Sequence, residues 1–231
     1  MRERRLAAAH VFVADLDQPV LDDQDAHHLT KVLRLRAGEI VSASDGRGSW
    51  RICRYDGSVA LLIGESEVKH DRGHERPLTV AFAVTKGDKP DLVIQKLTEL
   101  GIDHIVPIIT ERSIVRWDDE KGSRNQIRWQ KIAREAAMQS RGVFIPKVHE
   151  VFDSIGSFLE VFGNDVAVAE PEGEAIDEKI STIVVGPEGG FTHQEMALLE
   201  RRVALPGGIL RAETAALAAG VMLAAKRVQH G

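Results

Sequence analysis

The sequence has few of the residues that stabilise small secreted proteins or membrane-spanning ones. Cys53 is its one cysteine, so no intrachain disulfide can form. No apolar run approaches the roughly 20 residues that a bilayer span needs. Met1–Leu6 is followed by only a few apolar residues before Asp15, which is too short a stretch for a signal peptide. These absences predict a cytoplasmic protein that has no membrane partner.

The composition is that of an ordinary globular protein. Charged residues make up 28% and hydrophobic residues 43% of the 231 positions, a balance that excludes an intrinsically disordered chain. A chain of this length can bury one large core, or a core of usual size together with a small second module.

The net charge of −5 conceals an uneven distribution along the chain. Residues 27–54 hold six basic side chains against two acidic ones, and residues 112–147 hold nine against four. Residues 148–200 hold twelve acidic side chains and one basic one. Because a phosphate backbone responds to the local field, the two basic segments favour a nucleic-acid partner. The alternative is that both are ordinary solvated faces.

Up to about residue 70 the sequence is rich in turns and short β-type runs. Residues 25–33 have the composition of a short helix, and Asp-Gly pairs at 45–46 and 56–57 separate apolar runs. Strands at this spacing predict a small antiparallel barrel, followed by a polar linker over residues 69–77. The predicted strands are residues 39–43, 49–53 and 59–63.

After residue 77 the pattern changes to alternating strands and helices. Thr192 and Glu195 match a capping box at the start of one helix. The alternation predicts an α/β fold with a mainly parallel sheet. The predicted strands are residues 78–84, 102–109, 166–169 and 182–185, and the predicted helices are residues 90–100, 125–139 and 212–228.

Two glycine-rich loops carry the strongest indication of function. Val184–Phe191 leads from an apolar strand through Gly-Pro-Glu-Gly-Gly to the capped helix, and Leu205–Ala215 leads through Pro-Gly-Gly to the last helix. In open α/β sheets ligands bind at the carboxyl ends of strands, where glycine lets the backbone approach closely. Neither loop matches a P-loop or a G-x-G-x-x-G fingerprint. The alternative is a tight strand-to-helix turn without a ligand.

With both loops in view, the chain resembles the RsmE-type 16S ribosomal RNA (uracil-N3)-methyltransferases of the SPOUT superfamily. The resemblance extends over nearly the whole chain and rests on several motifs that occur in order. They are His27-His28-Leu29 with Val32-Leu33-Arg34, Asp45-Gly46-Arg47-Gly48, Lys86-Gly87-Asp88, Gln95-Lys96 with Glu99-Leu100-Gly101, Glu111-Arg112-Ser113, Glu135-Ala136 with Gln139-Ser140-Arg141, the Gly-Pro-Glu-Gly-Gly loop, and Ile209-Leu210-Arg211 with Glu213-Thr214-Ala215.

The resemblance implies an α/β protein with a PUA-like RNA-binding β-barrel domain over residues 1–72. Residues 73–231 would form a SPOUT methyltransferase domain whose trefoil knot binds S-adenosylmethionine, a topology that periodicity alone never suggests. It also implies a homodimer that acts on 16S rRNA, within the small ribosomal subunit. The chain departs from the family pattern at Pro206, Gly208 and Ala212. The predicted cofactor-binding residues are Gly186, Pro187, Glu188, Gly189, Gly190, Leu205, Gly207, Ile209, Leu210 and Thr214.

Methylation of uracil N3 requires a group that stabilises negative charge. N3 carries a proton at neutral pH and lies on the Watson–Crick edge, so the base must be unpaired before it reacts. Loss of the proton leaves an anion spread over two carbonyl oxygens, which an arginine can stabilise. Arg211 is the predicted arginine, and Glu188 is predicted as general base or backbone orienter. The alternatives are a salt bridge from Arg211 to Glu213 or Glu188, and a Glu188 that only stiffens its loop.

The remaining predicted site residues contact RNA, and no metal is expected, because a methyl sulfonium is already activated. His27 and His28 are neighbours that face different ways on a helix. Arg134 and Arg141 would share a helix face only if that helix reached residue 141. Trp117 and Trp129 could stack on bases, although tryptophan beside a helix is more often in a core or an interface. The predicted RNA-binding residues are Arg4, Arg5, His28, Arg34, Arg47, Arg112 and Arg141.

Two other functions stay open at this point. One is a knotted methyltransferase that acts on a ribose 2′-hydroxyl group or on tRNA. The other is a non-catalytic RNA-binding factor for ribosome assembly. An assembly factor would bind RNA without binding S-adenosylmethionine, so calorimetry with that compound separates it from the enzymes.

Overall fold

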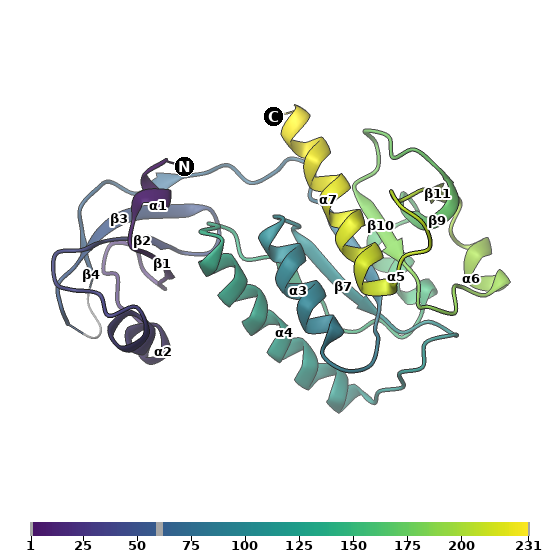
Figure 1. Ribbon diagram of the computed structural model, residues 1–231, viewed down its shortest axis with the longest axis horizontal. Coiled ribbons are helices and arrows are strands. Elements are labelled where there is room, and N and C mark those ends of the chain that lie inside the picture. Colours follow the sequence, from purple (N-terminus) through teal and green to yellow (C-terminus); the bar gives the residue numbers. More distant parts are fainter. Residues whose placement is uncertain (1, 59–61, 231) are drawn as a thin grey trace. The chain divides into compact units, whose positions relative to one another are not determined.

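The structure, a computed structural model, describes residues 2–58 and 62–230 (Figure 1). The chain divides into two compact units. Unit 1 consists of the residues up to 75 together with residues 137–145, and unit 2 consists of residues 76–136 and those from 146 onward. Unit 1 therefore includes a segment that is distant in sequence, taken from the end of a long helix.

Unit 1 is built on a mixed sheet in which β1, β2, β3 and β4 follow one another and β5 pairs with β3. β2 and β3 are antiparallel around a turn in which Gly46 and Gly48 have φ values of 73° and 107°. The carboxylate of Asp45 holds this turn by accepting hydrogen bonds from the backbone N–H groups of Arg47 and Ser49. The elements are α1 (Arg2–Leu6), β1 (Ala9–Phe12), α2 (Asp23–His27), a π-helical turn η1 (His28–Val32), β2 (Ile40–Ser44), β3 (Ser49–Tyr55), β4 (Leu62–Gly64) and β5 (Lys69–His70).

Unit 1 differs from the sequence prediction in three respects. β1 was not predicted, and it pairs with β2 in parallel, so the sheet is not wholly antiparallel as expected. The helix predicted at 25–33 begins earlier, because Asp22 caps it by accepting from the N–H of Asp25, and it continues as a π-helix. Lys69–His70, expected as linker, pairs with β3. The strand predicted at 59–63 falls partly on residues 59–61, which lie outside the described part of the chain.

Unit 2 is an α/β structure whose sheet, within the described residues, has six strands in the order β11-β9-β10-β6-β7-β8. All of its neighbouring strands are parallel, as predicted. The central strand β6 is buried on both faces, because Val80 and Phe82 point into one core and Ala81 into the other. The strands are β6 (Thr79–Ala83), β7 (His104–Ile108), β8 (Lys147–Val148), β9 (Ala167–Glu174), β10 (Thr182–Val185) and β11 (Arg201–Val203).

Helices cover both faces of this sheet (Figure 1). α3 (Lys89–Glu99), α4 (Asp119–Gln139) and α7 (Ala212–His230) contribute Leu97, Trp129 and Ala216 to the core on one face. α5 (Ile155–Phe162) contributes Phe158 to the other core. α6 (His193–Ala197) begins with the predicted capping box between Thr192 and Glu195. Among the described residues, no helix has both the length and the apolar character needed to cross a membrane.

The limits of two elements were predicted wrongly. α4 begins at Asp119 rather than 125, because the carboxylate of Asp118 accepts from the N–H of Lys121 and its carbonyl accepts from Gly122. The same helix ends at Gln139, so Arg134 and Arg141 do not share a helix face. β9 continues to Glu174, well past the apolar run that marked its start. The second half of β9 is mostly polar, so it lacks the alternation of apolar and polar residues that predicts a strand.

Candidate active site

The two glycine-rich loops line one cleft in unit 2. The cleft has a cavity volume of about 230 Å³ and lies at the carboxyl end of β10, beside the start of α7. It is open to solvent on one side, so a ligand larger than this volume can extend out of it. The lining residues are Ala169, Glu170, Pro171, Val185, Gly186, Pro187, Glu188, Gly190, Phe191, Leu205, Gly208, Ile209, Leu210, Ala212 and Ala215.

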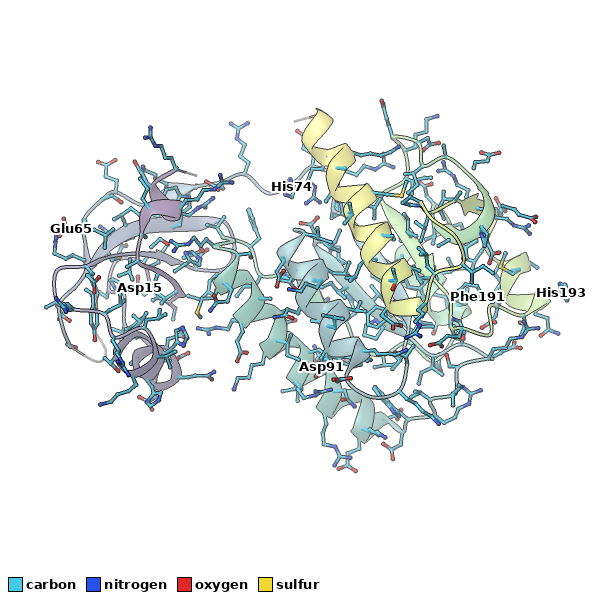
Figure 2. All side chains as sticks on the ribbon, viewed as in Figure 1. Asp15, Glu65, His74, Asp91, Phe191 and His193 are labelled. Atoms are coloured by element: carbon cyan, nitrogen blue, oxygen red, sulfur yellow. The ribbon has the colours of Figure 1, made fainter. Side chains whose placement is uncertain are left out.

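The first loop, residues 186–191, is held by contacts within itself. The ring of Phe191 packs on Gly186 so closely that a Cβ on Gly186 would lie 2.7 Å from it. Figure 2 shows Phe191 beside the N-terminal end of α7. The N–H of Gly190 donates to the carbonyl of Pro187 at 2.8 Å, and Gly190 has φ 66°. Glycine is needed at both positions, for space at Gly186 and for backbone conformation at Gly190.

The segment 110–116 supports this loop from outside. Arg112 Nη1 donates to the carbonyl of Gly189 at 3.0 Å. The buried carboxylate of Glu195 accepts from the backbone N–H of Glu111 at 2.9 Å, in addition to its part in the capping box. Arg116 donates to several backbone carbonyl groups of the same segment. The segment 110–116 therefore contacts both the loop after β10 and the helix that follows it.

The second loop, residues 205–211, has few contacts of its own. Gly207 has φ 109°, and a Cβ added to Gly208 would meet nothing within 4 Å. Ile209 is 96% exposed. An apolar side chain so exposed beside a cleft indicates a surface that a ligand or a partner covers.

A lysine joins the two loops. Lys89 Nζ lies 3.5 Å from Glu188 Oε1 in the first loop and 3.3 Å from Glu213 Oε2, two residues after the second loop. Glu213 Oε2 is buried without a hydrogen bond, so this contact is an ion pair rather than a directed hydrogen bond. Burial raises the pKa of the Glu213 carboxyl, but the N–H of its own backbone, Lys89 and the charge of Arg211 together lower it.

Arg211 is exposed and makes no side-chain hydrogen bond or ion pair with the described residues. Both carboxylates that were its alternative partners are paired with Lys89 instead. Arg211 therefore forms no ion pair with either carboxylate, although its charge is near enough to Glu213 to lower the pKa of that carboxyl. Sequence reasoning missed Lys89, although it follows directly on the Lys86-Gly87-Asp88 motif.

Seven of the ten predicted cofactor-binding residues line the cleft, namely Gly186, Pro187, Glu188, Gly190, Leu205, Ile209 and Leu210. Gly189 lies against Arg112, Gly207 lies behind Leu210, and Thr214 is exposed on the first turn of α7. Ala169, Glu170 and Pro171 also line the cleft and were missed. They belong to β9 and come directly after Ala167 and Val168, which pair with β10, so the end of the apolar run was the available indication.

In unit 1 the structure argues against two of the predicted RNA contacts. Arg4 is only 6% exposed: its guanidinium lies 4.7 Å from the Trp50 ring centroid, and Nη1 is 2.9 Å from Asp71 Oδ2. Arg141, with φ 58°, donates to the carbonyl groups of Arg4 and Ala7. Both arginines therefore hold the N-terminal segment in place. Their side chains are thus engaged within unit 1 and are not offered to RNA.

The other predicted RNA contacts are accessible. Arg34, Arg47 and Arg5 are exposed, and His28 is partly buried at the start of η1. Arg34 has φ 54°, at the point where the chain leaves η1. Arg112 is exposed in unit 2, where it touches the first loop.

A parallel α/β sheet with a glycine-lined cleft at its strand ends, joined to a small β unit, defines a two-part ligand-binding protein of the nucleotide or cofactor type. Comparison with known sequences makes this specific. Residues 73–224 match the family model of the RNA methyltransferase domain, and residues 21–57 match that of the RNA methyltransferase PUA domain. The chain belongs to this RNA methyltransferase family, which confirms the predicted family and the PUA-like N-terminal domain.

Individual relatives agree with the family match. The chain is 33% identical to the ribosomal RNA small subunit methyltransferase E of Bacillus subtilis, with 84% of each chain covered. It is 29% identical to the protein of the same name from Mycobacterium bovis, with 87% of this chain and 83% of that one covered. The structure of the Neisseria gonorrhoeae ribosomal RNA small subunit methyltransferase E bound to S-adenosylmethionine is 26% identical, with a TM-score of 0.78 over 93% of this chain and 96% of that one.

Proposed function

We propose that this chain transfers the methyl group of S-adenosylmethionine to N3 of one uridine in 16S rRNA. The observation that carries this proposal is the cleft at the carboxyl end of β10, with Arg211 next in sequence to two of its lining residues, Leu210 and Ala212. The names of its relatives support the substrate, and the named ligand of the Neisseria gonorrhoeae structure supports the cofactor. A ribosomal RNA substrate also supports a cytoplasmic location.

The residues of the cleft fit S-adenosylmethionine. Glycine backbone at residues 186, 190 and 208 gives close access to polar main-chain groups, and Leu205, Leu210 and Phe191 supply an apolar wall. Bound there, the cofactor supplies an activated methyl group on a sulfonium centre. The chain then has to align the nucleophile with that group and exclude water, and no group of the protein has to activate the methyl.

Arg211 and Glu188 perform the remaining chemistry in this proposal. Uracil N3 must lose a proton, and the carboxylate of Glu188, half exposed beside the cleft, accepts it. The negative charge then spreads onto the carbonyl oxygens of the base, where Arg211 stabilises it. The base must leave its helical stack to reach the cleft, so an unpaired uridine is the expected target.

The reaction is tested by mass spectrometry of rRNA nucleosides from a strain that lacks the gene. We expect N3-methyluridine to be absent from 16S rRNA in that strain and to return when the wild-type gene is supplied. Loss of a 2′-O-methylated nucleoside, or of a modified nucleoside from tRNA, would identify the rival enzyme. Calorimetry in which RNA binds and S-adenosylmethionine does not would identify an assembly factor.

We propose that unit 1 binds RNA phosphates through Arg34 and Arg47. Both are exposed, and both lie in the basic segment 27–54. Replacing both with alanine should weaken RNA binding several-fold and reduce its salt dependence by about one unit per lost phosphate contact. Lys179→Ala, in the acidic region, is the control and should change neither. An unchanged salt slope in the double variant would place the phosphate contacts elsewhere.

We propose that a second copy of the chain covers the outer face of α7. Between Glu213 and Lys226 this face carries no charge, and Leu217, Val221 and Ala225 are partly or fully exposed on it. Val221→Glu should convert a dimer to monomers in sedimentation analysis, whereas Lys179→Glu should not. The trefoil knot and the domain limits 1–72 and 73–231 stay predictions from the resemblance.

A further inference from the structure

Lys89 connects the start of α3 with two segments that adjoin the cleft. It follows β6, the strand that pairs with β10, so the segments after these two parallel strands emerge at the same edge of the sheet. From there its Nζ lies 3.5 Å from Glu188 Oε1 and 3.3 Å from Glu213 Oε2. One ammonium group therefore links the first residues of α3, the loop after β10 and the first turn of α7.

The backbone that carries Lys89 is well fixed. Pro90 restricts the first turn of α3, and α3 packs closely on α7. A Cβ on Gly220 of α7 would lie 2.5 Å from Leu97 of α3, which shows how near the two helices approach. Lys89 and Glu213 thus stand on two elements that cannot easily move apart.

The pairing decides which cation the carboxylate of Glu213 meets. Only 15% of the Glu213 side chain is exposed, and its buried Oε2 has no hydrogen bond. A carboxylate in such a position requires a nearby positive charge. Lys89 provides it, and Arg211 is the other cation whose charge reaches Glu213. Without Lys89, the exposed and unpaired Arg211 is the nearest replacement in sequence.

We propose that Lys89 is a positioning residue that occupies Glu188 and Glu213 and thereby keeps the guanidinium of Arg211 free for the substrate anion. The proposal rests on the function above only through the role assigned to Arg211. In this arrangement Lys89 meets the reacting groups only through Glu188, which stays ionised beside it as the proposed proton acceptor. It neutralises the two carboxylates that would otherwise form an ion pair with Arg211 and draw it away from the cleft.

The activity test compares Lys89→Met, Lys89→Arg and the double variant Lys89→Met with Glu213→Gln. Single-turnover methylation by Lys89→Met should fall roughly tenfold to a hundredfold, the range expected when a reacting group is displaced by about 1 Å. S-adenosylmethionine affinity should change less than about threefold. Lys89→Arg should keep most of the rate, and the double variant should recover part of it because no carboxylate at 213 captures Arg211. Lys179→Met removes the same charge elsewhere in unit 2 and should be unaffected.

A second measurement does not depend on activity. The Nε–Hε signal of Arg211 in ¹⁵N NMR, assigned by its loss in Arg211→Lys, reports whether this side chain is held. It should be mobile in the wild type, restrained in Lys89→Met and mobile again in the double variant. An equally mobile Arg211 in a folded Lys89→Met, or a double variant no faster than the single one, would overturn the proposal. An inactive wild-type chain would overturn the proposed function and leave the NMR result to be judged by itself.

Discussion

Two arginines of unit 1 and Arg211 of unit 2 have opposite surroundings. In unit 1, Arg4 is buried against Trp50 and paired with Asp71, and Arg141 donates to two backbone carbonyl groups. In unit 2, Arg211 is exposed with no side-chain partner among the described residues, while Lys89 pairs with both nearby carboxylates. A guanidinium with its partners already in place stabilises the fold, and one without them is available to a ligand. Whether an arginine stabilises the fold or can bind a ligand thus depends on the hydrogen-bond and ion-pair partners around it, and the residue type alone does not decide it.

The largest expected effect sharpens this contrast at Arg211. Arg211→Ala should lower single-turnover methylation about a hundredfold, equivalent to about 3 kcal/mol of transition-state stabilisation, because the substrate anion loses its donor. Arg211→Lys should recover little, since an ammonium group lacks the planar fork. Melting temperature and cofactor affinity should stay near the wild-type values. A variant that melts early and still methylates at the normal rate would contradict the catalytic role.

His10 in unit 1 should make stability depend on pH. The pKa of His10 is lowered from 6.5 to about 4, chiefly by burial and also by the charges of Arg4 and Arg141, while the hydrogen bond to the Gly142 carbonyl acts in the opposite direction. Between pH 6.5 and 4 the unfolded chain binds a proton that the folded chain does not. The free energy of unfolding therefore decreases as the pH is lowered through that window. The loss should approach about 3 kcal/mol.

Urea unfolding at pH 7 and pH 5 measures this effect. His10→Gln keeps a polar side chain at the site and removes the titration, so its stability should change less between the two pH values than that of the wild type. Equal pH dependence in the two proteins would assign the effect to other groups.

Arg4 and Arg34 form a matched pair within unit 1. Arg4→Met should lower the free energy of unfolding by about 2 kcal/mol, because Asp71 loses a charged hydrogen-bond partner and Trp50 loses its stacked cation. Arg34→Met, at an exposed position, should change it by less than about 0.5 kcal/mol. RNA affinity should show the reverse order once the folded fraction is taken into account. Denaturant titration and RNA binding at fixed salt measure both quantities.

The smallest effect compares the braced loop with the open one. Gly190→Ala should destabilise the protein by about 1 kcal/mol, since φ 66° is unfavourable for a residue with a Cβ. Gly208→Ala should be tolerated, because its φ is not left-handed and its Cβ would meet nothing within 4 Å. Thermal melting distinguishes the two. Equal losses would mean that the second loop is as tightly constrained as the first.

The sequence by itself determined the α/β pattern, the capped helix at Thr192 and the two loops. Apolar periodicity, glycine and capping residues act over a few positions, so they can be read without knowing the fold. The ends of helices were predicted less accurately where a single capping side chain sets them, as Asp118 does at the start of α4. Strand direction in unit 1 was also beyond reach, because β1 and β2 are joined by a long connection that local pattern does not describe.

Only the tertiary structure decided which charged residues are partners. Arg4 and Asp71 are 67 positions apart, and Lys89 is roughly a hundred positions or more from Glu188 and Glu213. Pairing over such separations depends on how strands are ordered in the sheet and how helices cover it, and composition is the same whether an arginine is buried or free. For that reason the sequence identified Arg211 as a candidate, and the fold supplied the observation that its two expected carboxylate partners belong to Lys89.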